Sequence, residues 1–359
     1  MELTQQTLSL MKELTEASGI PGGEKNVTRI LKQRYEEICD EVIYDALGSV
    51  YGVKRSHAEA PFRVMVSAHC DEVGLMVRAV RENGLLQFAT VGGVWETQLL
   101  SQRLRLETGD GRSYTGAMVA DSPKQIGPTQ ETVLQYSLGD FGFSSADEAY
   151  QAGVLEGDMV TLQCPFTVLN GGKRLLAKAW DDRYGCILGV ELLQLLKDIE
   201  LPFDLYVGAN AQEEVGLRGA RTAAAMVRPD LAVVLDCTAA NDVHGFQTPR
   251  GGLGQGVMVR FLDRTYIPNR ALQLDFLKLL REQGIPYQWH QSMGGTDAGE
   301  INLAEEGVPV LTACICARGV HTSASVIDRD DYLNARTAVS RFLLGLDRGK
   351  LELYRQGNR

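Results

Sequence analysis

The sequence has little of what would place it on nucleic acid or in a membrane. It has 36 Lys and Arg against 46 Asp and Glu, a formal net charge of −10, and no basic run interleaved with aromatic residues. Nucleic acid is not expected as a partner, because phosphate binding depends on clustered Lys and Arg. The most apolar stretches, such as residues 187–196, are interrupted by charge and too short to span a bilayer. No membrane segment is therefore expected.

The sequence also lacks the marks of a secreted protein. Its N-terminal segment carries Glu2 and Glu13 among apolar residues at helical spacing, whereas a signal peptide begins with basic residues and has an apolar centre. The seven cysteines are an odd, dispersed set, mostly within apolar runs. That distribution is typical of reduced thiols in a core rather than of a disulfide framework. We therefore expect a cytoplasmic protein.

The hydrophobic pattern predicts an α/β protein. With 359 residues, 44% of them hydrophobic, the chain can bury an extensive core and is expected to form two domains. Amphipathic helices are predicted at residues 3–18 and 24–37, and an apolar strand at residues 62–68. Beyond residue 182, helical and strand patterns alternate. The predicted helices are 183–198, 217–227, 270–283 and 330–346, and the predicted strands are 203–210, 231–236, 256–261 and 308–315.

The stretch from residue 73 to residue 164 has a different character. Short β-rich runs alternate there with turn signals at residues 82–84, 92–93 and 109–111, and one short helix is predicted near residues 144–153. This pattern indicates a small barrel or sandwich. We expect it to be an inserted domain, with residues 1–72 and 165–359 forming the larger domain around it.

Five residues of the kinds that bind metal ions lie at particular places in this predicted arrangement of strands and helices. All except Asp181 lie at or just beyond an apolar, strand-like run, and ligands collect at the carboxyl ends of strands in open α/β sheets. Taken singly, each has an ordinary explanation as a core histidine, a helix cap or a loop acid. Together, two histidines and three carboxylates match a two-metal site in which one carboxylate bridges the ions. The five residues are His69, Asp181, Glu214, Asp236 and His321.

Further acids lie beside these candidates. Glu213 and Glu214 directly follow an apolar strand, and burying such a pair is costly without a cation. One glutamate can bind a metal ion while its neighbour accepts a proton, or both can simply cap the helix that follows. Asp71, two residues after His69, can hold the imidazole and fix its tautomer.

The motifs as a set resemble the M42 family of metallo-aminopeptidases, which includes glutamyl aminopeptidase and tetrahedral dodecameric aminopeptidases. They occur in the family's order over nearly the whole chain. The last motif lacks a proline that many members have soon after its histidine, which leaves the shape of that loop open. The motifs are AHCDEVG at 68–74, AWDDRYG at 179–185, QEEVGLRGA at 212–220, LDC at 235–237, GGTDAG at 294–299 and GVHTSASVID at 319–328.

The resemblance implies a fold and an assembly. The fold is that of the co-catalytic zinc peptidases, with a mixed central sheet and helices on both faces. Residues 73–164 would be the PDZ-like dimerisation domain that interrupts the catalytic domain in this family. Family members commonly form dimers that build hollow dodecamers, so a homo-oligomer is expected.

The resemblance also implies a role for each candidate residue. Asp181 would bridge two divalent ions, Zn²⁺ or Co²⁺, and the other four ligands would be terminal, with His69 and Glu214 on different ions. Glu213 would be the general base that takes a proton from a bridging water, and Asp71 would orient His69. The peptide bond between Asp181 and Asp182 is expected to be cis. The implied activity is removal of N-terminal residues from short peptides, with the preferred side chain left open.

Two other functions stay open at this point. A carboxypeptidase or N-acyl amino-acid deacylase on the same scaffold would need a cation for the substrate carboxylate. A non-catalytic peptide-binding protein would use the acids for a structural ion, although a closed structural site does not need an unligated glutamate such as Glu213. The basic candidates for the first alternative are Arg183, Arg218, Arg250 and Arg318.

Overall fold

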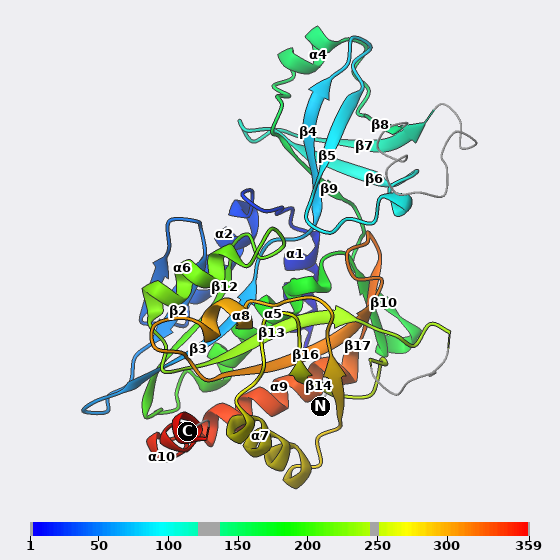
Figure 1. The fold of residues 1–359 in the computed structure, drawn as a ribbon. Coiled ribbons are helices and arrows are strands. Elements are labelled where there is room, and N and C mark those ends of the chain that lie inside the picture. Colours follow the sequence, from blue (N-terminus) through cyan, green and yellow to red (C-terminus); the bar gives the residue numbers. More distant parts are fainter. Residues whose placement is uncertain (1–2, 121–136, 245–250, 358–359) are drawn as a thin grey trace.

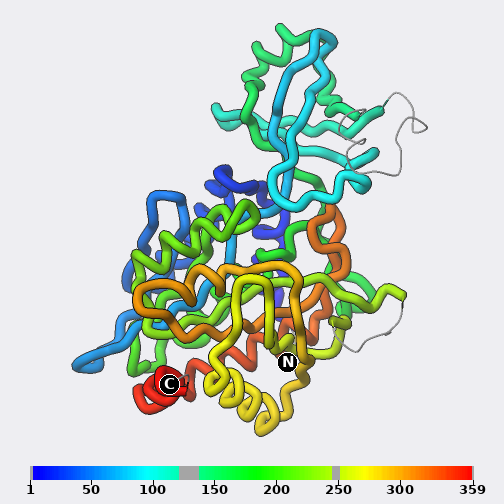
Figure 2. The backbone as a smooth tube through the Cα atoms, in the orientation of Figure 1, coloured from blue at the N-terminus to red at the C-terminus, as the bar shows by residue number. Residues whose placement is uncertain are grey.

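The computed structural model describes residues 3–120, 137–244 and 251–357, which form a mixed sheet covered by helices and a separate closed barrel (Figure 1). The backbone leaves the mixed sheet for the barrel after β3 (Phe62–His69) and returns to the sheet after β9 (Met159–Leu162) (Figure 2). Within the described ranges, no helix has the length and apolar character needed to cross a membrane.

The mixed sheet has four neighbouring parallel strands at its centre, β12, β3, β13 and β16. The flanking strands are antiparallel to them, and β14 and β15 form a parallel pair beside β16. In sheet order the strands are β1 (Glu41–Tyr44), β2 (Val50–Lys54), β12 (Phe203–Asn210), β3 (Phe62–His69), β13 (Leu231–Ala239), β16 (Val310–Arg318), β17 (Ser325–Asp328), β11 (Arg174–Ala177) and β10 (Thr167–Leu169), with β14 (Val257–Leu262) and β15 (Tyr287–Gln291) off this path.

Helices cover both faces of this sheet, as expected. Alternate residues of β3 point to opposite faces: Val64 and Val66 pack in one hydrophobic cluster and Met65 in another. Full burial of one such side chain stabilises the fold by roughly 1.5–3 kcal/mol. The first cluster includes α1 (Gln5–Glu16), α2 (Lys25–Glu36), α5 (Trp180–Leu196), α7 (Arg270–Glu282), α9 (Arg329–Leu344) and α10 (Arg348–Gln356), and the second includes α6 (Arg218–Val227) and α8 (Ala298–Asn302).

The β-rich stretch forms a closed barrel rather than a sandwich. It has its own hydrophobic core, in which Leu75, Phe88 and Leu106 are buried. The short helix α4 (Ala146–Gln151) packs on this barrel through the buried Ala149. In barrel order the strands are β4 (Gly74–Val80), β5 (Leu86–Val91), β8 (Ser137–Asp140), β7 (Ser113–Ala120), β6 (Arg103–Glu107) and β9 (Met159–Leu162).

Candidate metal centre

The parallel strands bring four of the five candidate ligands to one edge of the sheet. His69 is the last residue of β3, and Asp236 lies near the end of β13. Glu214 and His321 lie in the loops that follow β12 and β16. Since these four strands run in the same direction, their carboxyl ends meet at the same edge.

Asp181, the fifth candidate, reaches the same place from the start of α5. Its peptide bond to Asp182 is cis, as expected. Asp182 is fully buried and points away from solvent: its carboxylate accepts hydrogen bonds from the main-chain N–H of His69, at 3.2 Å, and of Gly185, at 3.0 Å. Asp182 therefore ties the end of β3 to the start of α5. No pattern in the sequence indicated that contact.

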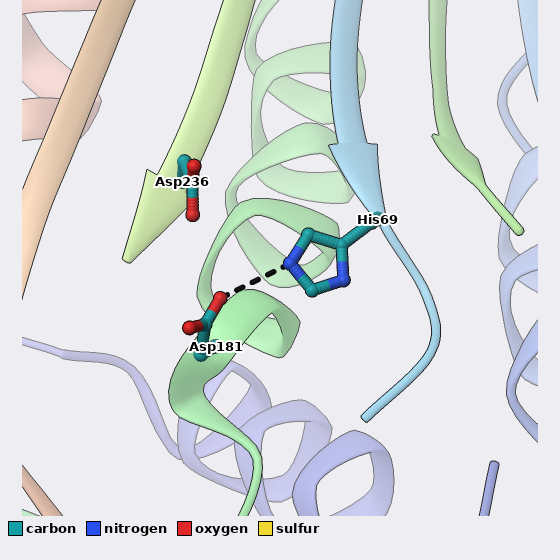
Figure 3. Close-up of side chains that lie close together, drawn as sticks. All are labelled: His69, Asp181 and Asp236. Atoms are coloured by element: carbon teal, nitrogen blue, oxygen red, sulfur yellow. Dashed lines mark hydrogen bonds and ion pairs between the residues drawn. The ribbon is translucent and has the colours of Figure 1, made fainter. Parts of the chain in front are cut away.

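Asp181 lies between the two histidines. Its Oδ1 is 3.0 Å from His69 Nε2, a contact shown in Figure 3, and its Oδ2 is 3.3 Å from His321 Nε2. Asp236 joins His69 and Asp181 in one group whose ligand atoms lie within 4.8 Å of one another, and Glu214 joins Asp181 and His321 in a second such group. His69, Glu213 and Glu214 form a third group of this kind, so Asp181, His69 and Glu214 each belong to two groups. Each oxygen of Asp181 faces a different imidazole.

The donor atoms of these groups suit divalent ions. Imidazole nitrogens and carboxylate oxygens are the ligands that Zn²⁺ and Co²⁺ accept readily. Glu214 Oε1 is buried and completes no hydrogen bond with a described residue, although His321 Nε2 lies 3.2 Å away. A buried carboxylate oxygen of this kind is costly unless a cation or donor compensates it. The residues present therefore fit a metal centre.

The pKa values of the groups reflect the crowding of negative charge. Burial, followed by the charge of Asp181, raises the pKa of Asp236 to about 8. Burial likewise raises the pKa of Glu213 well above its ordinary range. Burial alone would lower the pKa of His321, but the adjoining carboxylates of Asp181 and Glu214 raise it to about 11. A metal ion bound here would compete with protons for these groups.

Asp71 holds the loop that carries the two glutamates. Its two carboxylate oxygens accept hydrogen bonds from the main-chain N–H groups of Glu213 and Glu214, each at 3.0 Å. Its main-chain oxygen is 3.2 Å from His69 Nδ1, whereas the nearer carboxylate oxygen is 3.6 Å from that nitrogen. The contact with the imidazole is therefore made by the main chain of Asp71. The side chain fixes Glu213 and Glu214 relative to β3.

Three further contacts were not predicted from the sequence. The main-chain oxygen of Gly93, in the barrel loop after β5, is 3.2 Å from His321 Nδ1. Asn210, at the end of β12, donates to Asp297 Oδ2 at 2.8 Å and accepts from Tyr51 at 2.6 Å. The GGTDAG motif pointed to the segment that contains Asp297, but no local pattern indicates that Gly93 reaches His321.

Comparisons with known proteins show which family the chain belongs to. The family model described as M42 glutamyl aminopeptidase matches residues 48–337. The chain belongs to the M42 glutamyl aminopeptidase family. A second model, described as AMPT, matches residues 5–31.

Relatives of this M42 chain match it over nearly its whole length. A glutamyl aminopeptidase of Lactococcus lactis subsp. cremoris is 35% identical, and the match covers 95% of this chain and 97% of the relative. The solved TET aminopeptidase of Thaumarchaeota archaeon SCGC AB-539-E09 has a TM-score of 0.91 and 35% identity, covering 97% and 99% of the two chains. The TET1 peptidase of Pyrococcus horikoshii has a TM-score of 0.83 and 25% identity, and the match covers 95% of this chain and 100% of that chain. That peptidase can assemble into a tetrahedron or a large octahedral shell.

A narrow cavity of 20 Å³ opens beside the candidate ligands of this M42 protein. Its lining includes Asp181, Glu214 and His321 together with Leu162 and Lys178. Lys178 is buried, and its ammonium group donates to both carboxylate oxygens of Glu72. Burial lowers the pKa of Lys178 to about 8, although the charge of Glu72 opposes that effect.

Proposed function

We propose that this protein is a di-metal aminopeptidase that removes N-terminal residues from short peptides. The observation that supports the proposal best is the position of Asp181, which belongs to two groups of candidate ligands and faces a histidine in each. In the proposal His69 and Asp236 serve one ion, Glu214 and His321 serve the other, and Asp181 serves both. Zn²⁺ or Co²⁺ is the metal that this donor set favours.

Glu213 is the general base in this proposal. Its carboxylate makes no hydrogen bond or ion pair with another residue in the described part of the chain, while Asp71 fixes its main chain. When bound, the ions lower the pKa of a water molecule and polarise the peptide carbonyl. The Glu213 carboxylate takes a proton as the carbonyl is attacked and returns it to the leaving amine.

The arginines give little support to a carboxypeptidase or deacylase. Arg183 is fully buried and donates to main-chain oxygens, including those of Leu14 and Cys70. Arg318 is paired with both carboxylate oxygens of Asp242, at 2.7 and 2.8 Å. Arg218 is exposed and contacts Gln212, and Arg250 lies outside the described residues. A site crowded with acids suits a substrate α-ammonium better than a carboxylate.

We further propose that the chain forms homo-oligomers through residues 73–164 and that these residues act as a dimerisation domain. A barrel with its own sheet and its own core is suited to that role. The tetrahedral and octahedral assemblies of the Pyrococcus horikoshii relative support it. Light scattering of the intact protein and of a variant lacking residues 73–164 would measure the dependence of assembly on this segment.

The activity is tested with paired chromogenic substrates. Protein stripped of metal by a chelator and restored with Zn²⁺, Co²⁺ or Mn²⁺ is assayed on aminoacyl anilides and on their N-acetylated forms. An aminopeptidase hydrolyses only the free-amine forms and only after metal is restored. Preference for the acetylated forms would favour the deacylase, and no metal-dependent hydrolysis of any anilide or peptide would favour the non-catalytic alternative. A panel of aminoacyl anilides also gives the side-chain preference.

A further inference from the structure

A second, larger cavity adjoins the narrow one beside the candidate ligands. It has a volume of 380 Å³ and lies where α1 approaches the barrel strands β6 and β9. Leu162 and Lys178 line both cavities, so the larger cavity is a neighbour of the candidate metal centre. The larger cavity has no part in the chemistry proposed above.

The lining of this cavity is basic, although the chain as a whole carries a net charge of −10. It includes the four basic residues Lys12, Arg103, Arg105 and Lys178 and the single acid Glu16. Arg105 is paired with Glu107, and Lys178 with Glu72. Lys12 and Arg103 are exposed, and neither side chain has a hydrogen bond or ion pair with another residue of the described ranges.

The two unpaired cations therefore have no internal partner. Glu16, the acid nearest to them in the lining, already accepts a hydrogen bond from the main-chain N–H of Phe166, at 2.9 Å. A cavity wall with surplus positive charge attracts an anion, and in a partly enclosed site that attraction is stronger than at an open surface. The class of ligand indicated is a carboxylate or another small anion.

The separation of Lys178, which lines both cavities, from Asp181 suits a short peptide. Lys178 and Asp181 are three residues apart, so their Cα atoms are at most about 11 Å apart, which is also about the length of three extended peptide residues. A peptide whose first carbonyl lies at Asp181 could place a carboxylate near Lys178 within about three to five residues. The anion and the scissile bond would then belong to one molecule.

We propose that this cavity binds the C-terminal carboxylate of short peptide substrates. The proposal rests on the aminopeptidase function given above. It makes the protein a peptidase for small peptides with a free C-terminus, because long or C-terminally blocked chains cannot place a charge beside Lys12 and Arg103. The cavity thereby selects peptides by length, because it binds the C-terminus while the N-terminal residue is removed.

The experiment compares tripeptides, tetrapeptides and pentapeptides that carry either a free or an amidated C-terminus. The ratio of kcat/KM for the free acid to kcat/KM for the amide is measured for each length. We expect a ratio of about three or more at the best length, as two partly exposed ion pairs would give. The ratio should decrease as salt is raised from about 0.05 to about 0.5 M, because salt screens exposed charges.

The double variant Lys12→Met, Arg103→Gln should bring the ratio close to one. Arg78→Gln is the matched control, because Arg78 is an exposed arginine of β4 that does not line the cavity. A ratio near one in the unaltered protein, or an undiminished ratio in the double variant, would overturn the proposal. Turnover of an aminoacyl anilide, which has no carboxylate, is measured in parallel. If the anilide is hydrolysed and the ratio is one, the carboxylate site is wrong while the aminopeptidase function stands.

Discussion

Replacing Asp181 by asparagine should remove both metal ions, whereas replacing Asp236 by asparagine should remove one. Asp181 belongs to the group that contains Asp236 and to the group that contains His321, whereas Asp236 belongs to one group only. The substitution keeps the size of the side chain and takes away the charge that faces His69 and His321, at 3.0 and 3.3 Å. The two variants therefore differ in how many ions depend on the altered residue.

The expected change in stability follows from metal binding, because an ion that binds only the folded state stabilises that state. An ion present at one hundred times its Kd stabilises the folded state by about 2.7 kcal/mol, so two ions add about 5 kcal/mol. In a chain of this size, about 1 kcal/mol shifts the Tm by roughly 2 °C. Metal should then raise the Tm of the unaltered protein by about 10 °C, that of Asp236→Asn by about half as much, and that of Asp181→Asn by close to nothing.

Two measurements check this expectation: elemental analysis of purified protein, and thermal denaturation with and without added Zn²⁺. Asp147→Asn is the control, because Asp147 is an exposed acid of α4 in the barrel. It should keep two ions and the full shift. If Asp181→Asn kept both ions, or if Asp236→Asn lost both, the assignment of Asp181 as the shared ligand would be wrong.

Three further predictions concern the residues around the ligands. Glu213→Gln should keep its metal content and lower kcat by about 10²- to 10⁴-fold; wild-type kcat in that variant would refute the base assignment. Gly93→Ala should lower metal affinity by about 10- to 100-fold, because a Cβ there would lie 2.9 Å from His321 Nδ1. Gly109→Ala is the control. Its Cβ would meet nothing nearer than 3.9 Å, so metal titrations of this variant should match those of the unaltered protein. Metal-free protein should lose stability as pH rises from about 4 to 8. The pKa of Asp236 is about 8 in the folded protein, so Asp236 keeps its proton there, whereas the unfolded chain releases that proton above about pH 4. If the Tm of wild type and that of Asp236→Asn fell equally with pH, this reasoning would be wrong.

Much of the fold could be predicted because its strongest signals are local. The strands that end at His69 and Asn210 are apolar over most of their length, and α1, α2, α6 and α7 bury residues at helical spacing. The sequence pattern did not reveal β15, α8, β17 or α10. The first three are only five, five and four residues long, too short for a periodic pattern to stand out.

The candidate ligands could be predicted because of their places on strands, but the contacts that hold them could not. His69 and Asp236 lie at or near the ends of strands, and the glutamates follow one. These strands can be recognised from the sequence, and parallel strands bring such positions to one edge. The main-chain contacts made by Asp71 and Gly93 leave no trace in residue type, because any residue carries the same carbonyl group. Contacts of that kind depend on how distant segments pack, which sequence patterns do not report.

The contact between Gly93 and His321 means that the barrel is not a detachable module. A main-chain oxygen from the loop after β5 lies 3.2 Å from the imidazole of His321, 228 residues further along the chain. Any deletion that trims the barrel, or any binding partner that displaces this loop, also removes a support of one histidine in the metal centre. A truncated protein could thus fold its mixed sheet correctly and still hold metal poorly.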